Sequence, residues 1–120
     1  MTEYVVLIAG DEDNWWTDMT EEQRAHAYAE HGRFSTELER RGHTVTGGAE
    51  LHRSSEARSI PTGGGRPTEG PFVETTEQIG GFYMVETDDL DDLLECCQIL
   101  AKLGDGIEVR RTVAADERAS

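Results

Sequence analysis

Apolar and polar residues alternate along the chain in patterns that predict four strands. Short apolar, β-branched runs indicate strands at Tyr4–Ala9 and Gly80–Glu86, and a partly alternating run indicates another at Ile107–Val113. The segment His43–Leu51 alternates only in part and contains Gly47-Gly48, which is typical of a bent or bulged strand. We expect these strands to form one sheet.

A first helix is predicted by apolar residues at helical spacing. Thr20 and Gln23 have the spacing of a capping box, so the helix should run from Glu21 to about Arg41, with Gly42 as its stop signal. Its inward stripe comprises Ala27, His31, Phe34 and Leu38.

A second helix is predicted after Asp88 or Asp89, either of which can cap it, and Gly104 and Gly106 should end it. Its apolar stripe is longer than that of the first helix and comprises Leu90, Leu93, Leu94, Cys97, Leu100 and Ala101. This helix should supply much of the core.

A small hairpin is predicted between the second and third strands. Residues Ala57–Pro61 and Arg66–Glu69 flank the glycine-rich tip Thr62–Gly65, and the prolines favour a sheet edge. The order of elements is then strand, helix, strand, hairpin, strand, helix, strand. This is an α+β, ferredoxin-like βαββαβ plan with an inserted hairpin. We expect one domain over residues 1–113 and a flexible tail over 114–120.

The two helices of such a plan cover only one face of the sheet, so the other face needs a partner. A second copy of the chain is the usual solution, and we therefore expect a homodimer.

The charge of the chain limits its partners. Eleven basic and 25 acidic residues give a net charge of −14, which disfavours binding to nucleic acid or anionic membranes. Lys102 is the sole lysine, and the acidic surface fits either a salty cytoplasm or an ordinary well-solvated surface. The N-terminus lacks a signal-peptide pattern, so we expect a cytoplasmic location.

Neither a metal nor a cofactor is expected. Cys96 and Cys97 are adjacent and poorly placed to pair with each other, and the Cys/His spacing does not resemble a zinc site. The acidic run Asp11–Asp13 resembles a hard-metal loop only weakly, and we interpret it as a solvated loop.

The run Glu69–Tyr83 resembles the DGPF-domain branch of the YCII-related family, and the resemblance extends over nearly the whole chain. It implies a ferredoxin-like fold in a dimeric α+β barrel, in a branch whose activity is mostly unassigned. Glu69 stands where the branch has Asp, and Thr76 where it has Lys.

Related proteins of the wider superfamily include small-molecule enzymes with a His–Asp pair in the cleft. The wider family has an Asp-Pro near the end of the second helix, where this chain reads Gln98-Ile99-Leu100. We therefore expect no residue here to match the Asp of such a pair.

His31 is the first candidate for chemistry, because it lies on the inward stripe of the first helix, and the resemblance implies a cleft histidine there. Beside a carboxylate it could act as a general base, and the alternative is a core histidine with one hydrogen-bond partner. The other histidines, His26, His43 and His52, are expected on the surface.

Glu69 and Glu74 are the candidate catalytic carboxylates, and Glu77, Gly80 and Tyr83 are candidate ligand-binding residues. The glutamates could divide acid and base roles, or they could instead brace a tight turn. Glu74 and Glu77 would project to one side if their segment forms a helical turn. Tyr83 is expected to face the barrel interior, away from the helices.

Phe72 is expected to anchor the core, and Trp15 and Trp16 to cover its edge.

The leading hypothesis for the function is a domain that binds a small polar molecule in a dimer cleft, without robust catalysis. The alternative is a lyase or isomerase that moves a proton with His31 and a carboxylate. A third option follows from the resemblance, because related genes lie near those of sigma factors. A sigma-factor partner would need an exposed apolar patch, for which the two tryptophans are the candidates.

Overall fold

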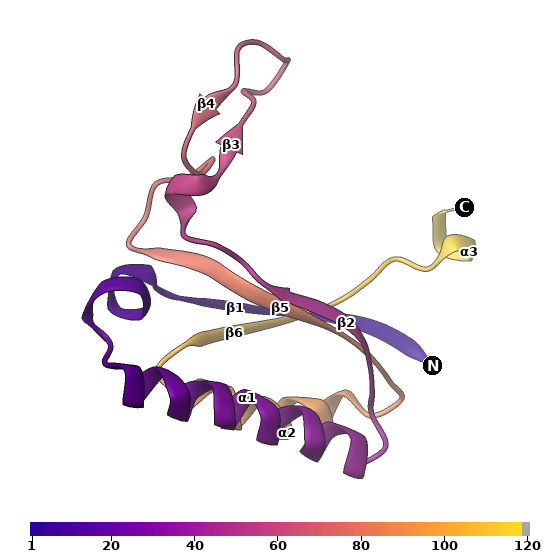
Figure 1. The fold of residues 1–120 in the computed structure, drawn as a ribbon. Coiled ribbons are helices and arrows are strands. Elements are labelled where there is room, and N and C mark those ends of the chain that lie inside the picture. The colour runs from indigo at the N-terminus through magenta and orange to yellow at the C-terminus, as the bar shows by residue number, and fades with distance from the viewer. Residues whose placement is uncertain (119–120) are drawn as a thin grey trace.

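The computed structural model describes residues 1–118, and its main body is an antiparallel sheet with two helices packed on one face (Figure 1). The elements of this body are β1 (Thr2–Asp11), α1 (Glu21–Arg40), β2 (Thr44–Glu50), β5 (Glu77–Thr87), α2 (Leu90–Ala101) and β6 (Gly106–Arg111). The strand order is β2-β5-β1-β6, and each neighbouring pair is antiparallel. The predicted α+β class and the order of its elements are confirmed.

Local signals set the ends of α1. The Thr20 side chain accepts the N–H of Gln23 while the Gln23 side chain accepts the N–H of Thr20, so the predicted capping box is present. At the other end Gly42 adopts φ +90°, and the next N–H, that of His43, donates to the Leu38 carbonyl at 2.9 Å. This Schellman-type turn directs His43 back under the helix.

The core lies between the helices and the sheet. Phe34 and Leu38 of α1 pack against Val6 of β1 and Val85 of β5, and all four are fully buried. The second helix buries Leu93, Cys96, Cys97 and Leu100. The predicted stripe of α2 is therefore only partly confirmed, because Leu90 and Leu94 are exposed while Cys96 takes an inward position.

The predicted bulge in β2 is present as a register shift between Val45 and Gly47 against β5. Strand β5 begins at Glu77, earlier than predicted, and Glu77 pairs with Asp11 of β1. The helical turn that would have aligned Glu74 with Glu77 does not form, because the second of these residues is already in the strand.

Residues 51–76 form an arm that projects from the sheet on the side away from the helices (Figure 1). Its hairpin consists of β3 (Arg58–Ser59) and β4 (Thr68–Glu69), joined by the predicted glycine tip. Phe72 is 70% exposed on this arm, so its prediction as a core anchor is wrong. Its segment leaves the hairpin before the chain re-enters the sheet, and it never reaches the helix layer.

The chain ends in a short helix, α3 (Ala115–Arg118), within the segment for which a flexible tail was predicted. Arg111 pairs with Glu117 at 2.6 Å and thereby ties α3 to the end of β6. Residues 119–120 of the predicted tail lie outside the described residues.

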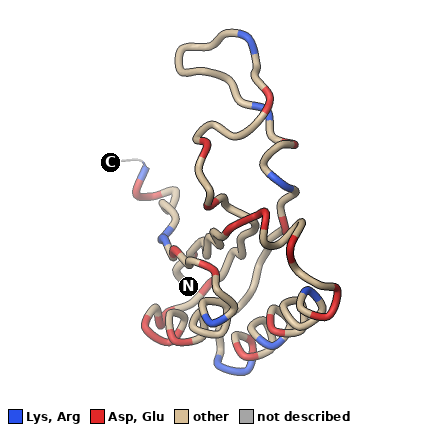
Figure 2. Tube along the Cα trace, turned by 90° about the vertical axis from the view of Figure 1, so that its left-hand side faces the viewer, with Lys and Arg blue, Asp and Glu red and all other residues tan. Residues whose placement is uncertain are grey.

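Acidic and basic residues are interspersed along the helices and the arm in the part of the chain that the structure describes (Figure 2). None of the helices described is long and apolar enough to cross a membrane.

Candidate functional site

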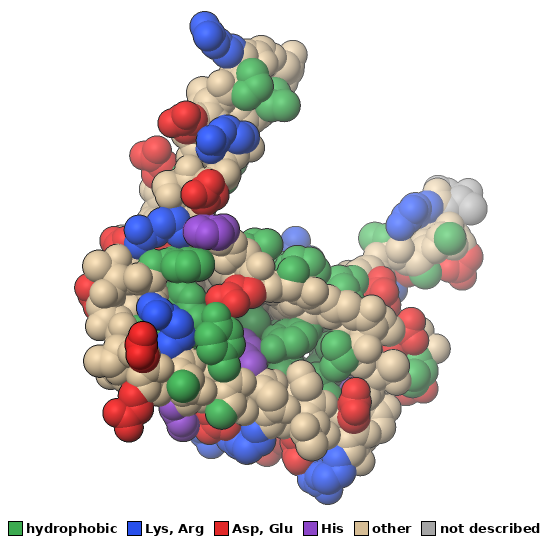
Figure 3. Space-filling model, viewed as in Figure 1, with side chains coloured by type: hydrophobic (Ala, Val, Ile, Leu, Met, Phe, Trp, Pro, Cys, Tyr) green, Lys and Arg blue, Asp and Glu red, His purple; other side chains and the backbone are tan. Residues whose placement is uncertain are grey.

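A cavity of about 420 Å³ lies between the N-terminal half of α1 and the adjoining end of the sheet. Its walls come from the end of β1, a π-helical turn (Asn14–Asp18), α1, the end of β2, the start of β5, and the turn after α2. Figure 3 shows the hollow, with hydrophobic side chains around it, a histidine inside and an acidic side chain at its edge. Cavities of this size accommodate small organic molecules.

His31 enters this cavity from α1, on the stripe that the sequence predicted. Its Nδ1 lies 2.7 Å from the Tyr83 hydroxyl, and the two rings stack with centroids 5.9 Å apart. Burial lowers the pKa of His31 below its ordinary value of 6.5, and the charges of Asp105 and Glu50 partly oppose that shift. The neutral imidazole is therefore favoured at pH 7, as a general base requires.

Tyr83 lies on the helix side of the sheet, packed on Phe34 with ring centroids 5.2 Å apart. The prediction that it faces away from the helices is wrong, because Tyr83 shares a strand face with Val85, which is buried under the helices. Burial raises the pKa of Tyr83, and a hydrogen bond from Ser35 partly offsets that rise. When the Tyr83 oxygen accepts a hydrogen bond from Ser35, the Tyr83 hydroxyl can donate its own hydrogen bond to His31 Nδ1. In that arrangement Nε2 of His31 carries the ring N–H.

Asp105 is the carboxylate that sequence reasoning missed. It lies in the turn between α2 and β6, lines the cavity, and is close enough to His31 for each charge to act on the other's pKa. Burial raises the pKa of Asp105 above its ordinary 3.8, and His31 partly opposes the rise. The segment Gln98-Ile99-Leu100, where the wider family has its Asp, holds no carboxylate, and Asp105 lies in the turn that follows the helix.

Two glycines admit Asp105 to this place. A Cβ at Gly10 would lie 2.5 Å from Asp105 Oδ1, so a side chain there would displace the carboxylate. Gly104 adopts φ +105°, which few other residues tolerate, and it turns the chain immediately before Asp105. The signal available in the sequence was Gly104-Asp105-Gly106, a carboxylate between two turn residues.

The glutamates predicted as catalytic lie elsewhere. Glu69 and Glu74 line a second, shallower cavity at the base of the arm, whereas Glu77 lines neither cavity. The structure does not bring them together with His31, and their catalytic role stays a prediction. Gly80, predicted to bind ligand, does line the cavity of His31.

Aromatic rings form the outer wall of the cavity. Trp15 meets Tyr28 edge to face with centroids 5.3 Å apart, and Trp16 stacks on His52 at 4.7 Å. The Tyr28 hydroxyl donates to the carboxylate of Glu50, with oxygens 2.9 and 3.1 Å away. The tryptophans were expected to cover the core edge, and they instead line a cavity beside it.

The sequence profile of the YCII-related domain matches residues 2–115. The chain belongs to the YCII-related family. A search of the curated proteins found no match.

The acidic loop of this YCII-related domain supports the cavity wall. Asp11 Oδ1 accepts the N–H of Asp13 at 3.0 Å, and Glu12 accepts both the N–H and the hydroxyl of Ser54. These carboxylates fasten the π-helical turn and the base of the arm.

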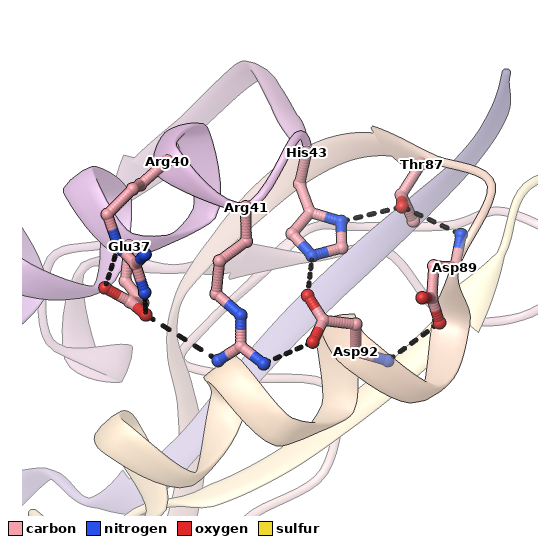
Figure 4. A network of polar contacts seen from close by, with 7 residues as sticks. All are labelled: Glu37, Arg40, Arg41, His43, Thr87, Asp89 and Asp92. Atoms are coloured by element: carbon pink, nitrogen blue, oxygen red, sulfur yellow. Dashed lines mark hydrogen bonds and ion pairs between the residues drawn. The ribbon is translucent and has the colours of Figure 1, made fainter.

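A second histidine cluster lies where the YCII-related domain joins the end of α1 to α2 (Figure 4). His43 is only 3% exposed, so its expected surface position is wrong. Its Nδ1 lies 2.7 Å from the Thr87 hydroxyl and its Nε2 lies 2.7 Å from an Asp92 oxygen. The other Asp92 oxygen accepts from Arg41.

A ring nitrogen of His43, a carboxylate oxygen of Asp92 and the Cys96 sulfur lie within 4.8 Å of one another, a set of donors that a divalent ion can use. A metal would have to displace the His43–Asp92 hydrogen bond and compete with Arg41 for the carboxylate. Burial also raises the pKa of Cys96, which favours the thiol over the thiolate. The existing contacts account for the cluster as a structural one.

Proposed function

We propose that this YCII-related domain binds a small polar organic molecule in the cavity of His31. The observation that carries the proposal is the convergence of His31, Tyr83 and Asp105 in one aromatic-walled cavity. Burial lowers the pKa of His31 and raises the pKa of Asp105, so it favours the neutral form of each. Groups with pKa values shifted in this way are common at binding and catalytic sites.

The test uses the two tryptophans, which both line the cavity. In a fragment screen followed by NMR, binders should shift both indole N–H resonances. His31→Gln should weaken those binders about ten-fold, because a hydrogen bond in a desolvated site is lost. The matched control is His26→Gln, an exposed position on the same helix, which should leave affinity unchanged. Fragments that bind equally well to both variants, or none that bind at all, would contradict the proposal.

A second candidate function, proton transfer of the lyase or isomerase type, has one specific observation in its favour. The pKa of Asp105 is raised and the pKa of His31 is lowered, so the two pKa values lie closer together than those of the free side chains. Asp105 would take a proton from a carbon beside a carbonyl group, while the His31 N–H would stabilise the developing oxyanion. In an isomerase, Asp105 would return the proton to a second carbon.

Exchange of substrate protons with deuterated solvent would report this reaction for a bound carbonyl compound. Asp105→Asn should abolish the exchange without abolishing binding. Exchange that persists at the wild-type rate in Asp105→Asn would remove Asp105 from the mechanism.

The quaternary structure we propose is a homodimer of ferredoxin-like domains in an α+β barrel, as in the DGPF branch. Alternation along β1 and β5 directs Val5, Leu7, Phe82 and Met84 away from the helices, onto a sheet face that the described residues leave open. Exposed Ile60, Phe72 and Val73 on the arm add apolar surface to that side. Sedimentation equilibrium should give twice the chain mass, and a monomer at micromolar concentration would contradict the barrel.

A partnership with a sigma factor stays a prediction. The exposed apolar side chains that it requires include Ile60, Phe72 and Val73 on the arm, and neither tryptophan is among them.

A further inference from the structure

The Asp and Glu side chains that line the cavity have no Lys or Arg among the described lining residues to balance them. They are the four carboxylates of Asp11, Glu12, Glu50 and Asp105. His31 and His52 are the lining groups that can become cationic, and the pKa of His31 is lowered. An anionic ligand would meet repulsion here without any fixed positive partner.

Two of the four carboxylates, those of Glu50 and Asp105, differ from the other two in their hydrogen-bond and charge partners. Asp11 and Glu12 accept backbone N–H groups of the acidic loop and the arm. By contrast, the one side-chain hydrogen bond that the Glu50 carboxylate accepts from the described residues comes from the neutral Tyr28 hydroxyl. No ion pair among the described residues involves Glu50 or Asp105. Asp105 is partly buried whereas Glu50 is exposed, so the lack of a cationic partner costs stability at Asp105, and a bound cation would offset that cost.

The aromatic wall is the second, independent feature that favours a cation. The aromatic side chains of Trp15, Trp16, Tyr28 and Tyr83 line the cavity. Aromatic faces attract ammonium groups through the ring quadrupole, most strongly where water is excluded. Arg24, which is outside the lining set, already holds its guanidinium carbon 5.3 Å from the Trp15 ring centroid, so this wall accepts a cation.

We propose that the cavity selects a small organic cation, an amine or quaternary ammonium, whose charge lies between Glu50, Asp105 and the aromatic wall. The inference rests on the proposed binding function and gives the ligand its chemical class. The apolar part of the ligand would pack on the indole rings while the ammonium group faces the two carboxylates.

The experiment titrates the full chain with three probes of similar size, at constant ionic strength, and follows tryptophan fluorescence. The probes are benzyltrimethylammonium, benzyl alcohol and phenylacetate. The ammonium should bind about ten-fold or more tightly than the other two, since a desolvated cation–π contact and two carboxylates both favour it.

Charge variants then locate the effect. Glu50→Gln and Asp105→Asn should each weaken the ammonium probe about three- to ten-fold. Glu95→Gln is the matched control, because it removes one negative charge from an exposed position on α2 outside the cavity. It should leave the affinity unchanged. A thermal melt of each variant shows that it is folded.

Three results would overturn the inference. Equal or tighter binding of benzyl alcohol or phenylacetate would reject cation selectivity while leaving the binding function in place. An equal loss in Glu95→Gln would assign the effect to net charge alone. Absence of binding by all three probes would reject this ligand class, and the fragment screen would then decide separately whether the cavity binds anything.

Discussion

His31 and His43 each lie near a hydroxyl group and an aspartate, and yet the two histidines form different kinds of site. Each imidazole has its Nδ1 2.7 Å from a hydroxyl of β5, Tyr83 for His31 and Thr87 for His43. Each also has an aspartate from the α2 region, Asp105 after the helix and Asp92 in its first turn. The two sites differ in what compensates the aspartate.

Asp92 is hydrogen-bonded to His43 and paired with Arg41, so its charge is balanced inside the protein (Figure 4). Asp105 has no arginine or lysine partner among the described residues, and it borders a cavity. A buried histidine whose aspartate is paired with an arginine stabilises a fold. A histidine beside an unpaired aspartate at a cavity can still bind a ligand. The structural site should therefore dominate stability and the cavity site should dominate binding.

The largest expected effect is on the structural site. His43→Ala should lower the free energy of unfolding by about 2–4 kcal/mol, because it leaves a buried hydroxyl and carboxylate without their partner. Urea denaturation at pH 7 measures the change. His31→Ala is the comparison variant and should cost less than half as much. Equal losses would remove the distinction between the two histidines.

A smaller effect of opposite sign is expected at Asp105. Asp105→Asn should stabilise the protein by about 0.5–1 kcal/mol at pH 7, because it removes a carboxylate whose ionisation burial disfavours. The sign follows from the raised pKa. From pH 3.8 up to the folded pKa the folded state binds more protons, so stability falls as the pH rises through that window. Thermal melts at pH 3.5 and pH 8, which lie on the two sides of the window's lower bound, should show a larger gain at pH 8, and a destabilised variant would contradict this account.

Gly10→Ala should separate the contribution of Asp105 to ligand binding from its effect on stability. The new methyl group would lie against Asp105 Oδ1 and turn the carboxylate aside, while the strand itself tolerates alanine. We expect a stability change within about 0.5 kcal/mol and several-fold weaker binding of the ammonium probe. Gly106→Ala, whose added Cβ would meet its nearest atom at 3.7 Å, is the control and should bind normally.

The smallest effect is the pH dependence contributed by His31. Because its folded pKa lies below 6.5, the unfolded chain binds more protons between the folded pKa and 6.5. The stability contribution is thus present above pH 6.5 and is lost as the pH falls through that window. The free energies of unfolding from urea titrations at pH 7.5 and pH 5.5 should differ less in His31→Gln than in the wild type, by a few tenths of a kcal/mol.

Much of the fold was predictable because its signals are local. The capping box at Thr20, the stop at Gly42 and the bulge at Gly47 each follow from neighbouring residues. Phe72 shows where this reasoning fails: an aromatic residue after Gly-Pro suggests core, and only the path of the arm shows that it is exposed.

The candidate site was half predictable. His31 was found because helical spacing identifies an inward position. Asp105 was missed because its meeting with His31 depends on tertiary packing between α1 and the turn after α2, across 74 residues of sequence. The alternation of residues along the strand correctly placed Tyr83 on the same face as Val85. It could not show which of the two faces packs against the helices.

The central claim is that Asp105, and not Glu69 or Glu74, is the carboxylate that acts on His31. NMR titration of the His31 imidazole in the wild type and in three variants tests it directly. The account predicts a His31 pKa below 6.5, lowered further in Asp105→Asn because a charge that raises it is removed, and unchanged in Glu69→Gln and Glu74→Gln. A His31 pKa that ignores Asp105→Asn, or that responds instead to either glutamate, would contradict the account.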